Sequence, residues 1–183
     1  MTTPAPRPVL LDDGTAPATT GALLHRLDAL GIRHRTVEHP PVFTVEEARR
    51  HKGGLPGAHT KNLFLRDKPG KRMWLICVMA DRDVDLRALP PRVGARPRLS
   101  FGSEDRLMRY LGVTPGAVSP FAIINDHGGR VQVVLDSQLL AGDVVNLHPL
   151  DNARTTALAP ADLLRFLDAE SHPPMVLAFE PEE

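Results

Sequence analysis

The chain has 183 residues, of which 42% are hydrophobic and 24% charged, with 22 basic and 22 acidic side chains. This length and composition suit one globular domain. The zero net charge argues against a protein that coats nucleic acid non-specifically, because such binding rests on many phosphate contacts, but it allows a local basic patch. Aromatic residues make up only 4% of the chain, too few for a platform that stacks RNA bases.

The single cysteine, Cys77, excludes an internal disulfide and a multi-cysteine metal site. It lies in the apolar run MWLICVMA, which predicts a buried structural thiol rather than a nucleophile. The eight histidines form no H-E-x-x-H motif, and P-loop and dinucleotide-binding glycine patterns are absent, so we expect no metal and no cofactor. No membrane-length apolar run or signal peptide is found, which predicts a soluble, cytoplasmic protein without a membrane partner.

The first third of the chain predicts a leader, a helix, a strand and a second helix. Residues 1–18 contain four prolines and predict a flexible leader before a domain over 19–183. TGALLHRLDALGI has leucines at helical spacing and Gly31 as a C-cap, and IRHRTVEH predicts a short strand. Thr44 and Glu47 then form a capping box that predicts a short helix.

The rest of the chain predicts hairpins that alternate with short helices. NLFLRD and RMWLICVMA flank KPGK and predict one hairpin, and PFAIIND and RVQVVLD flank HGG and predict another. Short helices are expected at VDLRAL and at SEDRLMRYLG, a strand at DVVNLHP and a closing helix at APADLLRFLDAE. We therefore predict an α/β fold: a single mixed, largely antiparallel sheet with surrounding short helices.

Three loops at strand ends carry the polar residues that could do chemistry. They are Thr60-Lys61-Asn62, the G-x-x-x-P loop from Gly116 to Pro120, and the segment HPLDN with His148 and Asn152. Taken singly, each also fits a structural role: an edge lysine is commonly solvated, a glycine-proline loop is commonly a turn, and a histidine before proline is commonly structural. These residues alone leave the function open.

Several separated blocks resemble a known family. EHPPVFTVEEA, GAHTKNLFLRD, LSFGSEDRLMRYLGVTPGAVSPFAIIND, VVLD and HPLDNARTTALAPADLLRFL stand in the order and at the spacing of the YbaK-like aminoacyl-tRNA deacylases, over about residues 20–170. The closest resemblance is to the freestanding ProX-type prolyl-tRNA deacylases, which share the fold of the editing domain of prolyl-tRNA synthetase. The resemblance implies a hydrolase that removes alanine mischarged onto tRNA(Pro), with water attack assisted by the ribose 2′-hydroxyl of the substrate.

The resemblance also implies roles for the loop residues. Lys61 would anchor a phosphate or ribose, Asn62 would hold a carbonyl and a hydroxyl, and the Gly116 loop would present backbone N–H groups to the oxyanion. Substrate contacts are expected from Thr60, Pro120, Phe121, His148 and Asn152, with FAII (121–124) as candidate walls of a pocket that excludes proline.

Two basic groups are the candidates for binding the acceptor stem of tRNA. They are the arginines of a stretch without acidic residues and the lysines at the first hairpin turn: Arg87, Arg92, Arg96, Arg98, Lys68 and Lys71. The expected partner is the alanine-bearing acceptor end of tRNA(Pro), with prolyl-tRNA synthetase as a second partner and the monomer as the expected state. Three alternatives stay open: a deacylase for serine, cysteine or threonine, a non-catalytic tRNA- or synthetase-binding module, and a small-molecule binding protein.

Overall fold

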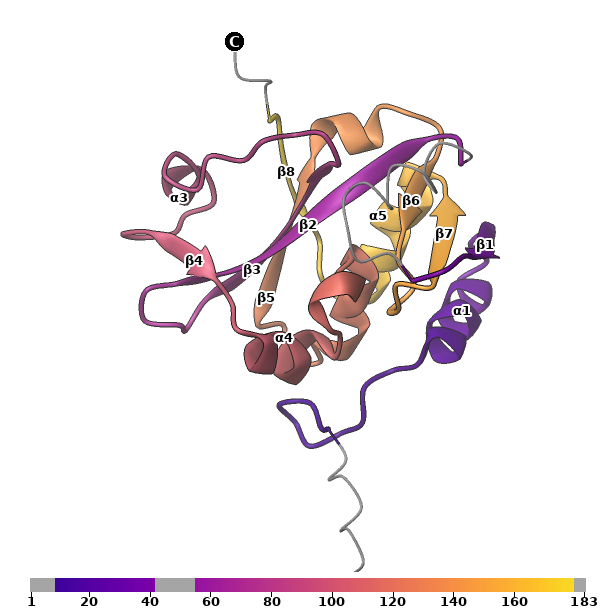
Figure 1. Ribbon diagram of the computed structural model, residues 1–183, viewed down its shortest axis with the longest axis horizontal. Helices are drawn as coiled ribbons and strands as arrows, with labels where there is room; N and C mark the ends of the chain where they lie inside the picture. Colours follow the sequence, from indigo (N-terminus) through magenta and orange to yellow (C-terminus); the bar gives the residue numbers. More distant parts are fainter. Residues whose placement is uncertain (1–8, 42–54, 180–183) are drawn as a thin grey trace, which may run out of the picture.

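The computed structural model describes residues 9–41 and 55–179 of the chain (Figure 1). The helical elements are α1 Thr20–Ala29, α3 Leu89–Arg92, α4 Glu104–Leu111, α5 Pro160–Ala169 and the 3-10 helices η1 Pro115–Ala117, η2 Pro120–Asn125 and η3 Ser137–Leu140. The strands are β1 His34–Glu38, β2 Ala58–Asp67, β3 Met73–Met79, β4 Leu99–Phe101, β5 Val131–Asp136, β6 Val145–Leu147, β7 Arg154–Leu158 and β8 Met175–Leu177. None of the described helices is long and apolar enough to cross a membrane.

Within the described residues, the strands form one mixed sheet in the order β1-β7-β6-β2-β3-β5-β8, with β4 also paired to β2. The pairings β1/β7, β6/β7, β2/β3 and β2/β4 are antiparallel. The pairings β2/β6, β3/β5 and β5/β8 are parallel. The predicted mixed sheet with short helices is confirmed: the antiparallel hairpin of β2 and β3 is flanked by the parallel pairings β2/β6 and β3/β5.

An apolar core lies on each face of the sheet. The first core joins alternate residues of β3 and β5, such as Leu75 and Val133, to the buried faces of α1, α4 and α5. The second core lies on the opposite face, where Trp74 and Ile76 pack against residues 89–99 around α3. Successive side chains of a strand point to opposite faces, so β2 and β3 contribute to both cores in alternation. In Figure 1, α3 and β4 lie beside the hairpin of β2 and β3, away from β1 and β7.

Most of the predicted local elements are confirmed. The leucines of α1 and the strand β1 lie where they were predicted, and β2 and β3 form the first hairpin. Ser103 accepts a hydrogen bond from the Arg106 N–H at the start of α4, and Gly112, at a φ of 63°, ends it in the left-handed conformation. Pro160 occupies the first turn of α5.

Two predicted elements are wrong. PFAIIND is not a strand, because Pro120 and the Ser119 side chain, which accepts from the Phe121 N–H, start the 3-10 helix η2. The second hairpin therefore does not form, and β5 pairs with β3 in parallel instead. VDLRAL is not helical, and the short helix α3 begins only at Leu89. The helix predicted from Thr44 and Glu47 lies outside the described residues.

The described part of the expected leader, residues 9–18, contacts the domain. Leu11 is buried, and the Asp12 N–H donates to the Arg109 carbonyl at the end of α4. The Arg109 guanidinium in turn binds the Asp12 carboxylate at 2.6 Å. The Ala18 N–H donates to the Asn125 side chain at 2.8 Å. These bonds hold the segment against α4 and η2.

Candidate functional site

The site is built on an interruption of strand pairing along one edge of β2. On this edge β2 pairs with β6 through Ala58 and His59, and with β4 only from Leu65 onward. Among the described residues, no strand pairs with 60–64 on this edge, although the Gly102 N–H donates to the Phe64 carbonyl. Backbone groups of alternate residues point to the same edge, so the N–H and C=O of Asn62 point into the same interruption as the Phe64 carbonyl. We call this interruption the β2 gap.

The β2 gap begins at a tight contact between two backbones. Gly57, at a φ of 103°, precedes β2, and a Cβ built on it would lie 2.6 Å from the Val144 carbonyl oxygen. Only glycine allows this approach. The Asn146 side-chain amide also donates to the Pro56 and Ala58 carbonyls, at 2.9 and 3.2 Å. Both contacts fix the start of β2 against β6 and so position the residues that follow.

Asn62 is the most constrained polar side chain at the gap. Its amide nitrogen donates to the Val118 carbonyl at 2.9 Å and to the Thr60 hydroxyl at 3.2 Å. Because a carbonyl only accepts, the Val118 contact fixes which end of the Asn62 amide is the nitrogen. The Asn62 Oδ1 is buried and has no hydrogen-bond partner. A buried acceptor without a donor is costly, so this oxygen is a candidate group for binding substrate.

Gly116 and Asn152 come together beside this residue. Gly116 lies in η1, two residues before Val118, and a Cβ built on it would lie 3.2 Å from the Asn152 amide nitrogen. The loop that carries Asn152 is anchored by Asp151, whose carboxylate accepts from the Thr20 hydroxyl at 2.9 Å and from Arg154 at 2.7 Å. The structure thus joins the G-x-x-x-P loop and the HPLDN segment at the β2 gap.

Lys61 points to the other face of β2. It lies opposite Val78, which belongs to the second core, whereas Asn62 lies opposite Cys77 of the first core. Its ammonium lies 3.9 Å from the Asp83 carboxylate, and the Lys61 side chain keeps 35% of its surface exposed. An exposed pair at this distance contributes little to stability. Lys61 and Asn62 therefore flank the gap from opposite faces rather than pointing together into one pocket.

His148 stands directly after β6, next to the Thr60–Asn62 segment. In the parallel register Asn146 lies beside His59, and His148 follows two residues later. Its Nδ1 donates to the Arg154 carbonyl at 2.9 Å, and its ring centre lies 6.2 Å from that of His39. The bond to a carbonyl places a proton on Nδ1. His148 is half-buried, so it is held in one orientation beside β2.

The residues expected to form the pocket walls are mostly buried in the structure. Phe121 has no exposed surface and packs edge-to-face against Phe166, with the ring centres 5.4 Å apart. Pro120 is buried at the start of η2, and Ala122 and Ile123 belong to the first core. These residues support the G-x-x-x-P loop from beneath.

The predicted basic residues are exposed and lie around the second core. The four arginines occur in and around α3, and the two lysines lie at the turn between β2 and β3. The Arg92 guanidinium also stacks over Phe179, 5.1 Å from the ring centre, and donates to the Ala178 carbonyl. Part of the basic stretch therefore holds the C-terminal strand segment in place.

A buried ion pair next to the site was missed. Arg82 follows β3 and Asp136 ends β5, and the Arg82 Nε lies 3.6 Å from a carboxylate oxygen of Asp136. The Arg82 guanidinium also donates to the Gln138 side chain. This pair positions the loop that carries Asp83, the partner of Lys61. An arginine within DRD gives no sequence sign of burial, because adjacent charges are typical of exposed loops.

The chemistry available at the gap is that of a binding and polarising site. Cys77 is fully buried, and burial raises the pKa of its thiol, so the predicted structural role of this residue is confirmed. No group of three or more metal-ligating side chains occurs among the described residues. The described residues at the gap include oriented amides, backbone groups and the His148 ring, with a cation on the far face of the strand. Such a set suits an ester that is already reactive toward water.

The fold and the gap thus define a mixed-sheet domain with oriented polar groups at a strand edge. Residues 39–166 match the model of the aminoacyl-tRNA editing domain. The chain belongs to this family and is an aminoacyl-tRNA deacylase.

Relatives agree with this family, and a solved structure shares the fold. The prolyl-tRNA synthetase associated domain-containing protein 1 of Bos taurus is 44% identical over 162 residues, 87% of this chain and 94% of that protein. The prolyl-tRNA editing protein ProX of Acetoanaerobium sticklandii is 40% identical over 151 residues, 82% of this chain and 92% of that protein. A crystal structure of a candidate trans-editing enzyme for prolyl-tRNA synthetase has a TM-score of 0.68 at 20% identity, covering 91% of this chain and 100% of that one. At this identity the last match shows the fold alone.

Proposed function

We propose that the protein is a trans-editing hydrolase that removes alanine from mischarged tRNA(Pro). The observation that carries the proposal is the β2 gap, where the unpaired Asn62 oxygen, the Gly116 loop and Asn152 meet in a chain of the editing-domain family. The similarity to a prolyl-tRNA editing protein, which covers most of both chains, supports tRNA(Pro) as the carrier. A synthetase site built for proline rejects smaller alanine poorly, because a missing methylene is worth only about 1–3 kcal/mol.

In the proposed reaction, water attacks the ester between alanine and the terminal ribose. The water oxygen bonds to the carbonyl carbon, the 2′-hydroxyl takes the water proton and passes its own proton to the departing 3′-oxygen, and the bond between that oxygen and the carbonyl carbon breaks, which releases alanine. Water is thus the nucleophile, and the substrate supplies the base. Both amide hydrogens of Asn62 form hydrogen bonds within the protein, so only its oxygen remains to bind the substrate. Its proposed role is therefore to accept from the α-ammonium or a ribose hydroxyl, rather than to hold a carbonyl and a hydroxyl together. Backbone N–H groups of the Gly116 loop are the proposed donors to the oxyanion.

Binding of the RNA is proposed to follow the positive charge around the second core. Lys61, which emerges on that face, would contact a phosphate of the terminal nucleotides, and the arginines around α3 and the lysines of the hairpin turn would contact the acceptor stem. His148 would border the amino-acid pocket. Because Phe121 is buried, the wall that excludes proline is proposed to come from residues nearer the gap, such as Val118. We propose that the protein acts in the cytoplasm as a monomer, alongside prolyl-tRNA synthetase.

The test is deacylation of tRNA(Pro) charged with alanine, proline, serine or cysteine, and of tRNA charged with threonine, by the wild type, Lys61→Ala and the control Arg35→Ala. Arg35 is an exposed cation on β1, at the far edge of the sheet. Rapid loss of alanine alone, reduced in Lys61→Ala and unchanged in Arg35→Ala, is the expected result. Loss of another amino acid instead would refute the alanine assignment. Binding of tRNA without cleavage would identify a non-catalytic module, and failure to bind tRNA at low salt would favour a small-molecule binding protein.

A further inference from the structure

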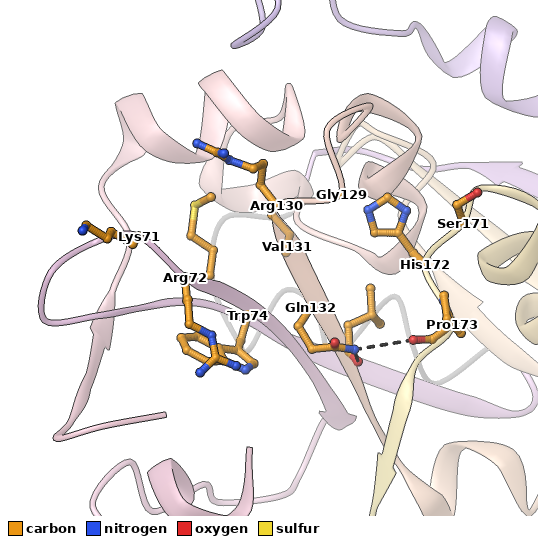
Figure 2. Close-up of a pocket in the computed structure, with 12 residues that line it drawn as sticks. Lys71, Arg72, Trp74, Gly129, Arg130, Val131, Gln132, Ser171, His172 and Pro173 are labelled. Atoms are coloured by element: carbon orange, nitrogen blue, oxygen red, sulfur yellow. Dashed lines mark hydrogen bonds between the residues drawn. The ribbon is translucent and has the colours of Figure 1, made fainter. Parts of the chain in front are cut away.

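A separate pocket lies at the opposite end of β3 and β5 from the β2 gap. It is a cavity of about 380 Å³ lined by the hairpin turn and the start of β3, by the turn and first residues of β5, and by the segment after α5. Its lining residues include three cations: Lys71, Arg72 and Arg130. Figure 2 shows these three on one side of the pocket, facing Ser171 and Pro173 on the other.

The positive charge of this pocket is not neutralised by its lining, which contains no aspartate or glutamate. Two buried carboxylates are bonded to backbone groups of the lining. Asp67 accepts from the Lys71 and Arg72 N–H groups, and Asp126 is also bonded to the His172 ring. Within the described chain, the Lys71 ammonium and the Arg130 guanidinium make no hydrogen bond or ion pair, and both residues are exposed. The pocket therefore presents free cations to an anionic ligand.

The pocket is built to bind charge rather than a base. Its aromatic residue, Trp74, is 1% exposed, lies beneath the Arg72 guanidinium at 4.9 Å and donates through its indole N–H to the Val93 carbonyl. It therefore offers no free face for stacking. The polar groups that remain are the Gln132 amide, which donates to the Pro173 and Val133 carbonyls, and the exposed Ser171. Cations beside hydroxyl and amide groups suit a phosphate and its sugar.

The position of the pocket fits a second contact to the same RNA. Cys77 lies opposite Asn62, and Arg72 is five residues earlier along the chain, so about 17 Å separate the two regions at the rise of a strand. An RNA whose 3′ end lies in the β2 gap carries further phosphates at such distances. Resting on the proposed function, we propose that this pocket binds a backbone phosphate of the tRNA whose aminoacylated end occupies the gap.

The experiment compares Lys71→Gln/Arg130→Gln with the control Arg33→Gln/Arg35→Gln, which removes two exposed cations near β1. Thermal unfolding establishes that both variants fold. Binding of uncharged tRNA is measured over a range of salt concentrations. The pocket variant is expected to bind about tenfold more weakly, with a salt slope shallower by roughly 0.7–0.9 for each phosphate that the pocket no longer neutralises. Hydrolysis of alanyl-adenosine, which lacks the RNA backbone, by the single variant Arg130→Gln is expected to equal that of the wild type.

Equal tRNA affinity and salt slope in the two double variants would overturn the proposal. Loss of binding to inorganic phosphate or ADP in the pocket variant, with unchanged tRNA binding, would also overturn it and assign the pocket to a small phosphorylated ligand. If the wild type cleaves neither alanyl-tRNA nor alanyl-adenosine, the proposed hydrolysis fails. The tRNA-binding comparison still tests the pocket in that case.

Discussion

Replacing Asn62 by alanine separates the role of this residue in the fold from its role toward substrate. The change removes the donor to the Val118 carbonyl, which is buried, and the weaker 3.2 Å bond to Thr60. A buried carbonyl left without a donor costs about 1–3 kcal/mol. The same change also removes the Asn62 oxygen, which is itself buried without a partner and carries a comparable penalty. We therefore expect the free energy of unfolding to fall by no more than about 1–2 kcal/mol.

The expected effect on catalysis is larger. A hydrogen bond to a charged group such as the substrate ammonium contributes about 1.5–3 kcal/mol, which corresponds to a roughly 10- to 150-fold loss of kcat/KM for Ala-tRNA(Pro). For the unfolding measurement, Thr60→Val is the matched control, since it removes the 3.2 Å bond and leaves the bond from Asn62 to Val118 intact. Urea unfolding and single-turnover deacylation measure the two quantities. An Asn62→Ala enzyme whose kcat/KM stays within about twofold of the wild type would refute the proposed contact.

Three further predictions concern other parts of the molecule. Gly116→Ala places a methyl group 3.2 Å from the Asn152 amide, so deacylation should fall about tenfold while the melting temperature changes little, and unchanged deacylation would contradict this. Burial opposes the charged forms of His172 and Asp126, but their mutual 2.8 Å bond and further hydrogen bonds outweigh it, raising the pKa of His172 and lowering that of Asp126. The contribution of the His172 charge to the free energy of unfolding is thus complete below its unfolded pKa of about 6.5. It is lost as the pH rises through its higher folded pKa. His172→Gln should lower the unfolding free energy by about 3 kcal/mol at pH 5.5 and by less at pH 9, and an equal loss at both would contradict the assignment. Cys77 should react with a thiol reagent only after unfolding, and labelling of the native protein would refute its burial.

Local capping patterns were sufficient to predict several elements. Ser103 and Gly112 bound α4 as expected because each satisfies backbone groups within a few residues of its own position. The segment PFAIIND failed because a short apolar run fits a buried helix as well as a strand. Its burial depends on contacts with α5, which begins only at Pro160, as well as with the neighbouring α4. The parallel pairing of β5 with β3 likewise depends on contacts that no local pattern specifies.

The site shows the same division between local and distant information. The sequence singled out Thr60, Lys61 and Asn62 as a loop at a strand end, but they lie inside β2, which begins at Ala58. Their contacts were not predictable. The opposite directions of Lys61 and Asn62 follow from strand alternation alone, which was available from the sequence. The meeting of Gly116 with Asn152 and of Asn62 with Val118 depends on how η1 and the loop after β6 pack over β2, and this is a property of the assembled sheet.

The interruption of pairing along β2 explains how two neighbours that point apart can serve one substrate. A continuous strand would separate Lys61 from Asn62 by the thickness of the sheet. Along this edge neither β6 nor β4 extends across residues 60–64, so among the described residues no strand separates the two faces of β2 there. In the proposed function, a single-stranded 3′ end crossing this edge would bring its ester to Asn62 and the Gly116 loop on one face and its phosphate to Lys61 on the other. In this proposal, a described strand that extended across residues 60–64 along this edge would block the path between the two residues.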